Sequence, residues 1–221
     1  FQLYSTFVIE EKFGFNKTSP QTFTTDKLKG YLLGAIVGGG LLSLLIYLTN
    51  TIGPNFWIWF GVIAAAFILF VNMFYTSFIL PLFNKLTPLA GGDLKAAIEA
   101  FAQKINFPLD NIFVMDGSKR SAKANAFFSG IGKKKKIVLY DTLINNHTTD
   151  ELVAVLAHEV GHFKKKHIIW SYLISIIQVF FILFVLSKMI YNQNLSLALG
   201  GTQQAIHLNL IAFGILFSPI S

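Results

Sequence analysis

A long stretch without charged residues sets the strongest limit on how this chain can fold. Between Lys29 and Lys85 there is no Asp, Glu, Lys or Arg, and after His167 the only charged residue is Lys188. A run of about 18 or more predominantly apolar residues is long enough to cross the hydrocarbon core of a bilayer as a helix. Most of the charges lie between residues 85 and 166. This order predicts membrane helices on both sides of a polar insert.

Four apolar segments are the predicted membrane helices. They are residues 31–48, residues 56–80, residues 168–187 and a segment that begins at Ile206. Trp57, Trp59 and Trp170 stand at the entrances of the second and third segments, where indole rings anchor helices at the membrane interface. Pro81 is expected to end the second segment, because proline cannot continue a helix. We therefore expect a mainly α-helical membrane protein, a multi-helix transmembrane bundle.

Basic residues predict the orientation of these helices. Those next to the apolar segments on one side are Lys27, Lys29, Lys85, Lys164, Lys165 and Lys166. The loops on the other side, 49–55 and 188–204, carry almost no charge. Loops rich in lysine face the cytoplasm. We therefore expect a multi-pass protein with a cytoplasmic insert, in a bacterial inner membrane or the endoplasmic reticulum.

The net charge of +7 indicates a lipid membrane as a partner and no nucleic acid. A basic surface at the cytoplasmic face of a membrane is attracted to anionic lipid. The lysines at 133–136 have no interleaved aromatic residues, which single-stranded nucleic acid would stack on. We interpret that lysine run as the solvated tip of a loop rather than a lipid-binding site.

The chain divides into three predicted segments. Residues 1–84 hold an N-terminal segment and two membrane helices, 85–166 form the insert, and 167–221 hold further membrane helices, the last of them cut short. There is no cysteine, so a disulfide framework and a thiolate metal site are both excluded. The chain begins at Phe1 and stops inside an apolar run, so we expect it to be a fragment of a longer protein.

The insert has the pattern of a small α+β domain. Apolar residues recur at helical spacing at Leu94, Ile98, Phe101 and Ile105, so a helix is expected over 93–105. Three short β-prone runs are predicted strands, at 112–115, 125–129 and 137–140. The last two should pair as a β-hairpin, because a glycine-rich and lysine-rich stretch separates them.

A second helix of the insert is expected to begin after Thr148. Glu151 follows Thr148 by three residues, which is the spacing of a capping box. The apolar residues that then recur on one face are Leu152, Val155, Leu156 and Val160. No proline interrupts residues 149–191, so this helix should run almost directly into the third membrane segment.

A His-Glu-x-x-His pattern on that helix contains candidate metal-binding and catalytic residues. Residues four apart lie on one helix face, so His158 and His162 can direct ring nitrogens at one zinc ion. Glu159 is close enough to take a proton from an attacking water molecule without being a ligand. This is the arrangement of zinc hydrolases. The alternative is a helix that merely presents two surface histidines.

Three blocks of sequence resemble the CAAX prenyl protease 1 family of membrane-embedded zinc endopeptidases. The blocks are residues 10–17, then 116–121 with 125–130 and 136–143, and then 158–162 with His167 nearby. They follow the family's order across nearly the whole chain. The resemblance implies several transmembrane helices around an internal chamber, with the zinc site facing that chamber and the zinc-protease insert built as predicted above.

The resemblance also implies roles for individual residues. It implies one zinc ion per chain, held by His158 and His162, with Glu159 as the general base. It implies that Asn125, Ala126 and Phe127 belong to an edge strand that binds an extended peptide substrate by strand addition. His167 is a minor candidate for support of the transition-state oxyanion.

One ligand that the resemblance implies is absent from this sequence. Members of the family take a third zinc ligand, a glutamate, from a later helix, and no Asp or Glu follows Glu159 here. Asp150 and Glu151 lie two turns back on the same helix and point poorly for a closed site. We therefore expect these 221 residues alone to bind zinc weakly and to cleave poorly.

Three functions stay open on the sequence. The first is cleavage near the C-terminus of a prenylated CAAX-type protein or peptide substrate, which the block at residues 10–17 favours. The second is quality control of membrane proteins by a related metalloprotease. The third, from another class, is a non-catalytic membrane scaffold or transporter, which has no evident need for Glu159 between two histidines.

Overall fold

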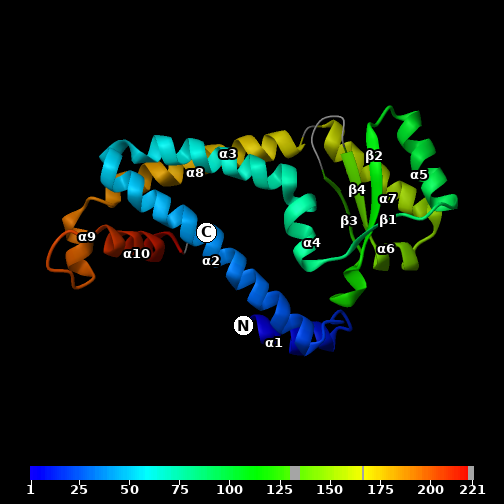
Figure 1. The fold of residues 1–221 in the computed structure, drawn as a ribbon, viewed down its shortest axis with the longest axis horizontal. Coiled ribbons are helices and arrows are strands. Elements are labelled where there is room, and N and C mark those ends of the chain that lie inside the picture. The colour runs from blue at the N-terminus through cyan, green and yellow to red at the C-terminus, as the bar shows by residue number, and fades with distance from the viewer. Residues whose placement is uncertain (130–134, 166, 219–221) are drawn as a thin grey trace. The chain divides into compact units, whose positions relative to one another are not determined.

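A computed structural model of the chain divides into two compact units (Figure 1). The residues that it describes are 1–129, 135–165 and 167–218. Unit 1 comprises Phe1–Tyr31 and Phe70–Ile168, and unit 2 comprises Leu32–Leu69 and Ile169–Ser221. The tip of the predicted hairpin, at residues 130–134, lies outside the described residues. The three-part division of the chain stays a prediction.

Unit 1 contains a four-stranded mixed sheet. Its strands are β1 (Leu86–Pro88), β2 (Leu109–Met115), β3 (Ala126–Ser129) and β4 (Lys135–Tyr140), in the order β1-β2-β4-β3. β1 and β2 are antiparallel, β2 and β4 are parallel, and β3 and β4 are antiparallel. The pairing of β3 with β4 confirms the predicted hairpin. β3 is at the edge of the sheet, a position that leaves one row of its backbone groups free to pair with another strand.

Helices of unit 1 pack on the sheet through an apolar core. They are α5 (Asp93–Lys104), α6 (Asp141–Asn146) and α7 (Thr149–Lys164). Ile98 of α5, Leu139 of β4 and Leu156 of α7 are among the buried side chains of this core. The helix predicted over 93–105 is confirmed, and so is the inward apolar face of α7. This packing holds α7 by one side and leaves its other side accessible.

The capping box at the start of α7 is present. The backbone N–H of Thr148 donates to a Glu151 carboxylate oxygen at 2.8 Å, and the Thr148 hydroxyl donates to the same oxygen at 3.0 Å. In return, the backbone N–H of Glu151 donates to the Thr148 hydroxyl at 3.4 Å. These bonds satisfy backbone donors that have no partner inside the helix.

The capping box makes a small part of the stability depend on pH. The pKa of Glu151 lies below its ordinary value because the backbone N–H of Thr148, and then its hydroxyl, donate to the carboxylate. Such a group stabilises the fold above its unfolded-state pKa, and this stabilisation is lost as pH falls through the lower, folded-state pKa. A Glu151→Gln protein should therefore lose less thermal stability than the natural one between about pH 5 and pH 3. Thermal unfolding over a pH series measures the difference, and parallel curves would contradict the expectation.

The N-terminal segment of unit 1 docks against the loop that precedes β3. The segment begins with α1 (Gln2–Tyr4) and a π-helical turn (Ser5–Glu10), and it leads into α2 (Pro20–Ile52). The Phe15 carbonyl accepts a bond from the Ala122 N–H at 2.9 Å, and the Glu10 carboxylate pairs with the Lys123 ammonium at 2.8 Å. Between the first two blocks of the family resemblance, the N–H of Lys17 donates to the Arg120 carbonyl at 3.0 Å, so these blocks touch one another.

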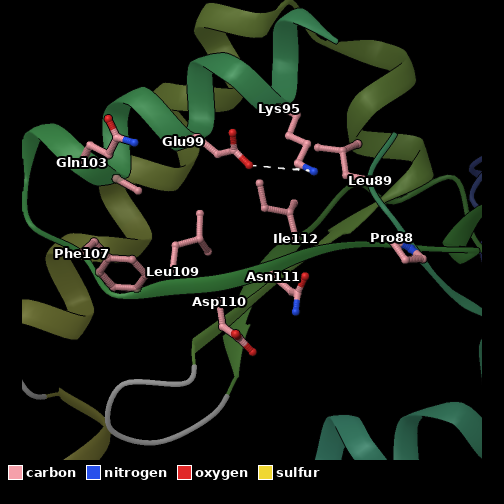
Figure 2. A pocket seen from close by; sticks show the side chains of 11 residues that line it. Pro88, Leu89, Lys95, Glu99, Gln103, Phe107, Leu109, Asp110, Asn111 and Ile112 are labelled. Atoms are coloured by element: carbon pink, nitrogen blue, oxygen red, sulfur yellow. Dashed lines mark ion pairs between the residues drawn. The ribbon is translucent and has the colours of Figure 1, made fainter. Parts of the chain in front are cut away.

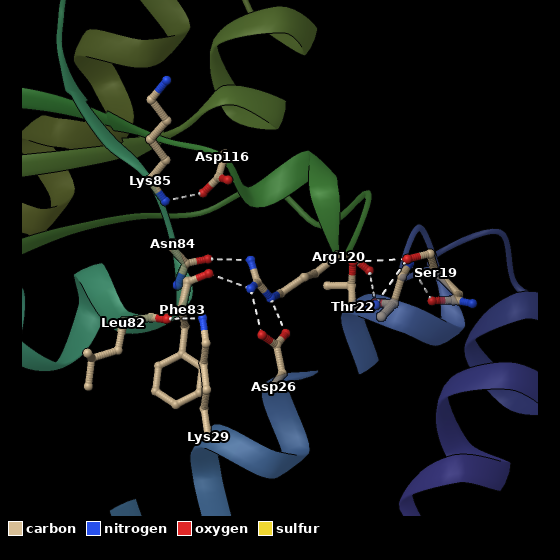
Figure 3. Close-up of polar contacts among 12 residues, drawn as sticks. Ser19, Thr22, Asp26, Lys29, Leu82, Phe83, Asn84, Lys85, Asp116 and Arg120 are labelled. Carbon is tan, nitrogen blue, oxygen red and sulfur yellow. Dashed lines mark hydrogen bonds and ion pairs between the residues drawn. The ribbon is translucent and has the colours of Figure 1, made fainter. Parts of the chain in front are cut away.

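Arg120 is the centre of this docking (Figure 3). Its guanidinium binds both carboxylate oxygens of Asp26 on α2, at 2.7 and 3.0 Å. The same group donates to the Asn84 side chain at 2.9 Å and to the Phe83 carbonyl. The Arg120 carbonyl accepts a bond from the Thr18 hydroxyl at 2.9 Å. One side chain thus joins three segments of unit 1 that are far apart in the sequence.

Replacing this arginine should destabilise unit 1. Both side chains of the Arg120–Asp26 pair are 23% exposed, so the Arg120→Met change leaves a largely buried carboxylate without its partner. We expect a loss of about 2 kcal/mol in the free energy of unfolding. The Arg120→Lys change should recover only part of this loss, because an ammonium cannot form the two-pronged contact.

Lys119 provides the matched control for that measurement. It precedes Arg120 and is exposed, so Lys119→Met should change the unfolding free energy by less than about 0.5 kcal/mol. Denaturant unfolding of the proteins in detergent compares them. Equal stability of the Arg120→Met and Lys119→Met proteins would contradict the role given to Arg120.

Unit 2 is helical. It contains the larger part of α2, a reversal at a 3₁₀ turn (Gly53–Asn55), most of α3 (Phe56–Phe74) and of α8 (His167–Met189), α9 (Gln193–Ala198) and α10 (Ile206–Phe217). Buried Phe56 packs with Leu183 and Ile190 of the α8 region. At Gly61 of α3, an added Cβ would lie 2.7 Å from the Phe180 ring, so a larger side chain there would require this ring to shift.

The described helices include segments that are long and apolar enough to cross a membrane. One is the region Pro20–Phe83, which the turn at Gly53–Asn55 divides into α2 and α3, and another is Ile169–Met189. Apolar side chains on them point outward; Ile36 and Ile177 are 65% and 69% exposed. The first three predicted membrane helices are confirmed as helices, and α10 is a shorter apolar helix of 12 residues at the predicted fourth.

The expected end of the second membrane helix at Pro81 is corrected. Helical conformation continues through a π-helical turn (Tyr75–Ile79) into α4 (Leu80–Phe83). Pro81 lies in the first turn of α4. Proline is tolerated in membrane helices where local π-helical adjustments satisfy the freed backbone groups, and the turn at Tyr75–Ile79 directly before α4 is such an adjustment.

Candidate functional site

Helix α7 presents the His-Glu-x-x-His pattern on its accessible side. Leu156 and Val160 are buried, with exposed fractions of 1% and 5%, and they fix the rotation of the helix. His158 and His162 lie on the exposed side of α7. Glu159 is half-buried, at the boundary between this side and the buried side. The hydrophobic stripe that the sequence predicted therefore also determines which way the histidines face.

The two histidines direct the same ring atom at one point. His158 Nε2 and His162 Nε2 are 3.1 Å apart, and the ring centroids are 4.8 Å apart at an interplanar angle of 69°. Two nitrogens bound to one tetrahedral zinc ion, each at 2.0–2.1 Å, would be about 3.3 Å apart. Neutral imidazole is also a zinc ligand of the right chemical kind. The pair therefore fits two positions of a zinc site.

No third ligand joins the pair within residues 1–129, 135–165 and 167–218. There, the structure contains no group of three or more His, Asp or Glu side chains arranged to hold a metal ion. Glu151, which the sequence offered as a poor substitute, is instead occupied by the capping box. A catalytic zinc site uses three protein ligands and keeps one position for water or substrate.

His167 lies behind His162 rather than beside the shared point. It is the first residue of α8, and its Nδ1 is 2.8 Å from Nδ1 of His162. The two ring centroids are 4.9 Å apart at an interplanar angle of 74°. His167 therefore contacts the edge of the His162 ring that Nε2 does not occupy.

The edge strand β3 lies close to the motif helix. Helix α7 contacts β3, and Val160 of the motif belongs to the same apolar cluster as Phe128 of β3. The Phe128 ring also packs against Phe107, with centroids 5.1 Å apart. This packing fixes the strand predicted to bind substrate relative to the helix predicted to bind zinc.

The hydrogen bonding of β3 shows which of its backbone groups face outward. The N–H of Tyr140 donates to the Asn125 carbonyl at 3.0 Å, and Ala126 is opposite Leu139 in the hairpin register. In an antiparallel pair, such bonded positions alternate with positions that face away from the partner. The backbone groups of Phe127 therefore face β4, whereas those of Ala126 and Phe128 face the open edge.

Asn125 is engaged within its own chain. Its side-chain oxygen accepts a bond from the N–H of Ala126 at 2.9 Å. Its side chain also hydrogen-bonds Tyr140. Burial raises the pKa of Tyr140 above its ordinary value, and the bond with Asn125 offsets part of this rise. Asn125 thus shapes the first residue of the edge strand.

Two cavities of unit 1 lie apart from the histidines. One, of about 310 Å³, lies between α5 and the strands β1 and β2, where Lys95 and Glu99 form an ion pair of 3.9 Å (Figure 2). The other, of about 590 Å³, is lined by Arg120, Asn125 and Tyr140 among others. Neither is lined by His158, Glu159 or His162.

Two residues that line the cavity beside Asn125 were not singled out from the sequence. Arg120 was treated only as part of a block, although it is the only arginine in the chain, which is a usable indication of a special contact. Tyr140 was assigned only to a strand. Nothing in its local sequence indicates that it contacts Asn125, because that contact depends on the register of the hairpin.

Comparison with known proteins identifies the family of the chain. The family described as CAAX prenyl protease N-terminal, five membrane helices, matches residues 1–85, and Peptidase family M48 matches residues 88–220. The CAAX prenyl protease 1 of Saccharomyces cerevisiae is 45% identical over 81% of this chain and 40% of its own length. The homologue from Homo sapiens is 33% identical over 98% of this chain and 54% of its own length.

A solved structure has the same fold. The crystal structure of S. mikatae Ste24p matches with a TM-score of 0.91 and 36% identity, and the match covers 99% of this chain and 55% of that one. The chain thus spans about half the length of the relatives it matches. The expected family and the expected fold, a mainly helical membrane protein with a small α+β insert, are both confirmed. The chain belongs to peptidase family M48 and is a homologue of the CAAX prenyl proteases.

Proposed function

We propose that the protein is a membrane-embedded zinc metalloendopeptidase that cleaves near the C-terminus of prenylated CAAX-type substrates. The observation that carries the proposal is the 3.1 Å separation of His158 Nε2 and His162 Nε2 on a helix packed against an open edge strand. The names of the relatives, CAAX prenyl protease 1, support the substrate class. The proposed protein is multi-pass, and its insert faces the cytoplasm.

The zinc site proposed here uses His158 and His162 through their Nε2 atoms. When bound, zinc lowers the pKa of water and polarises the carbonyl of the scissile peptide. For both Nε2 atoms to be ligands, each neutral ring must carry its proton on Nδ1. A third protein ligand is proposed from outside the described residues, as the family resemblance implies.

Glu159 is the proposed general base. It follows His158 on α7, so its carboxylate is next to the metal-binding face without sharing it. The carboxylate accepts the proton of the attacking water and returns it to the departing amine, so that the peptide bond breaks without a free amide anion. The role of oxyanion support for His167 stays a prediction from the family resemblance.

The edge strand is the proposed substrate cradle. An extended peptide that adds to β3 would pair with the outward groups of Ala126 and Phe128, and not with those of Phe127. Asn125 contributes by shaping the start of the strand. Because main-chain hydrogen bonds supply the affinity, β3 would bind peptides of many sequences. The lipid group of the substrate would supply the selectivity.

Backbone methylation of the substrate tests strand addition. Peptides that carry one N-methyl group at successive positions should show KM raised about 10-fold at alternate residues, because each lost backbone bond is worth about 1 to 1.5 kcal/mol. Steady-state kinetics over the methylated series measures the pattern. A KM that is uniform along the series would contradict strand addition at β3.

A pair of matched peptides tests the substrate class. In the full natural protein, a farnesylated CAAX peptide should be cleaved with much higher kcat/KM than its unprenylated twin. Equal cleavage of both, together with cleavage of unfolded membrane proteins, would favour the alternative of a quality-control protease. Mass spectrometry of the products also locates the cleaved bond.

A further inference from the structure

The strongest unassigned contact of the candidate site is between His162 and His167. Their Nδ1 atoms are 2.8 Å apart, which is a hydrogen-bond distance. Helix α7 ends at Lys164, and His167 is the first residue of α8. In an uninterrupted helix, residues five apart do not share a face.

The contact determines which nitrogen of His162 carries the proton. A neutral imidazole has one N–H and one free lone pair, and the bond made by one nitrogen decides the state of the other. If His162 Nδ1–H donates to Nδ1 of His167, then Nε2 of His162 keeps its lone pair. That lone pair points to the same place as Nε2 of His158, 3.1 Å away.

We propose that His167 is a positioning residue, which accepts the Nδ1–H of His162 and holds its Nε2 ready for the metal. This inference rests on the zinc site of the proposed function. It assigns His167 neither to the metal nor to the substrate, because the Nδ1 of His167 that forms the contact is directed at the far edge of the His162 ring. Partners of this kind fix the tautomer and the orientation of a ligating histidine.

Zinc affinity is the decisive measurement, and it does not depend on activity. In the full natural protein, His167→Ala should weaken zinc binding about 10- to 100-fold in competition with a chelator. His167→Asn should recover most of the affinity, because the Asn side-chain oxygen can take the place of Nδ1 as acceptor. The visible absorption of the cobalt-substituted protein should change in the Ala variant and return towards the natural spectrum in the Asn variant.

His207→Ala is the matched control. His207 is an exposed histidine on α10, so its removal should leave zinc affinity and the cobalt spectrum unchanged. Unchanged zinc affinity and spectrum in His167→Ala, with a fall in kcat alone, would overturn the inference in favour of the oxyanion role. An equal loss of zinc in His207→Ala would also overturn it.

The proposed function can fail separately from this inference. If His158→Ala and His162→Ala leave zinc binding intact, the zinc site itself is wrong, and the role of His167 is wrong with it. If those two variants lose zinc and His167→Ala does not, the zinc site stands and only the positioning role is overturned.

Discussion

Replacing Glu159 by Gln is expected to reduce peptide cleavage by about 10²- to 10⁴-fold, which is the usual contribution of a general base. Glutamine has nearly the same size and is also a good helix former, so α7 should keep its fold. It cannot accept a proton from the attacking water. Because Glu159 is not a proposed ligand, the variant should retain its zinc. Cleavage of a farnesylated peptide and metal content, measured on the same preparation, test both statements.

The same helix offers a matched control for this substitution. Glu151→Gln makes the identical chemical change two turns earlier, and glutamine can still form the capping box with Thr148. That variant should cleave the peptide at the natural rate at neutral pH. Full cleavage activity in Glu159→Gln would exclude the general-base role of Glu159. Absence of cleavage by the natural full protein would instead favour the non-catalytic scaffold.

Replacing His158 by Ala is expected to weaken zinc binding by more than about 100-fold. This exceeds the loss that is typical when a residue that only hydrogen-bonds a metal ligand is removed. The substitution removes one of the two Nε2 atoms that converge at 3.1 Å, and no side chain of the described residues stands ready to replace it. Removal of His162 should have the same effect. Chelator competition and metal analysis of the purified protein measure the loss, and cleavage should fall with it.

The His158→Ala protein should keep the natural fold, and this is measured together with its zinc binding. His158 is exposed, so its replacement by alanine leaves no cavity in the core, and thermal unfolding of the metal-free protein should be unchanged. His207→Ala serves again as a histidine control outside the site. Zinc binding at natural strength in His158→Ala would place the metal elsewhere.

Features that depend on neighbours in the sequence could be predicted without a structure. The membrane helices followed from charge-free apolar runs, and α7 followed from the capping box at Thr148 and Glu151 and from its apolar stripe. The proximity of His158 and His162 followed from helical geometry alone, since residues four apart share a face. The pairing of β3 with β4 followed from two β-prone runs on either side of a glycine-rich and lysine-rich stretch of sequence. Each of these features depends on residues close together in the sequence, so it can be recognised from the sequence alone.

Contacts between distant segments were decided only by the tertiary structure. Nothing in the sequence around Arg120 indicates that its partner is Asp26, which lies 94 residues away. The outward orientation of Ala126 and Phe128 depended on the hairpin register. The contact of His167 with His162 does not follow from helical spacing either. The physical reason is the same in each case. The sequence by itself determined the long helices, the β3–β4 pair and the apolar face of α7, but it did not predict β1. Packing of the apolar faces decided which polar side chains meet.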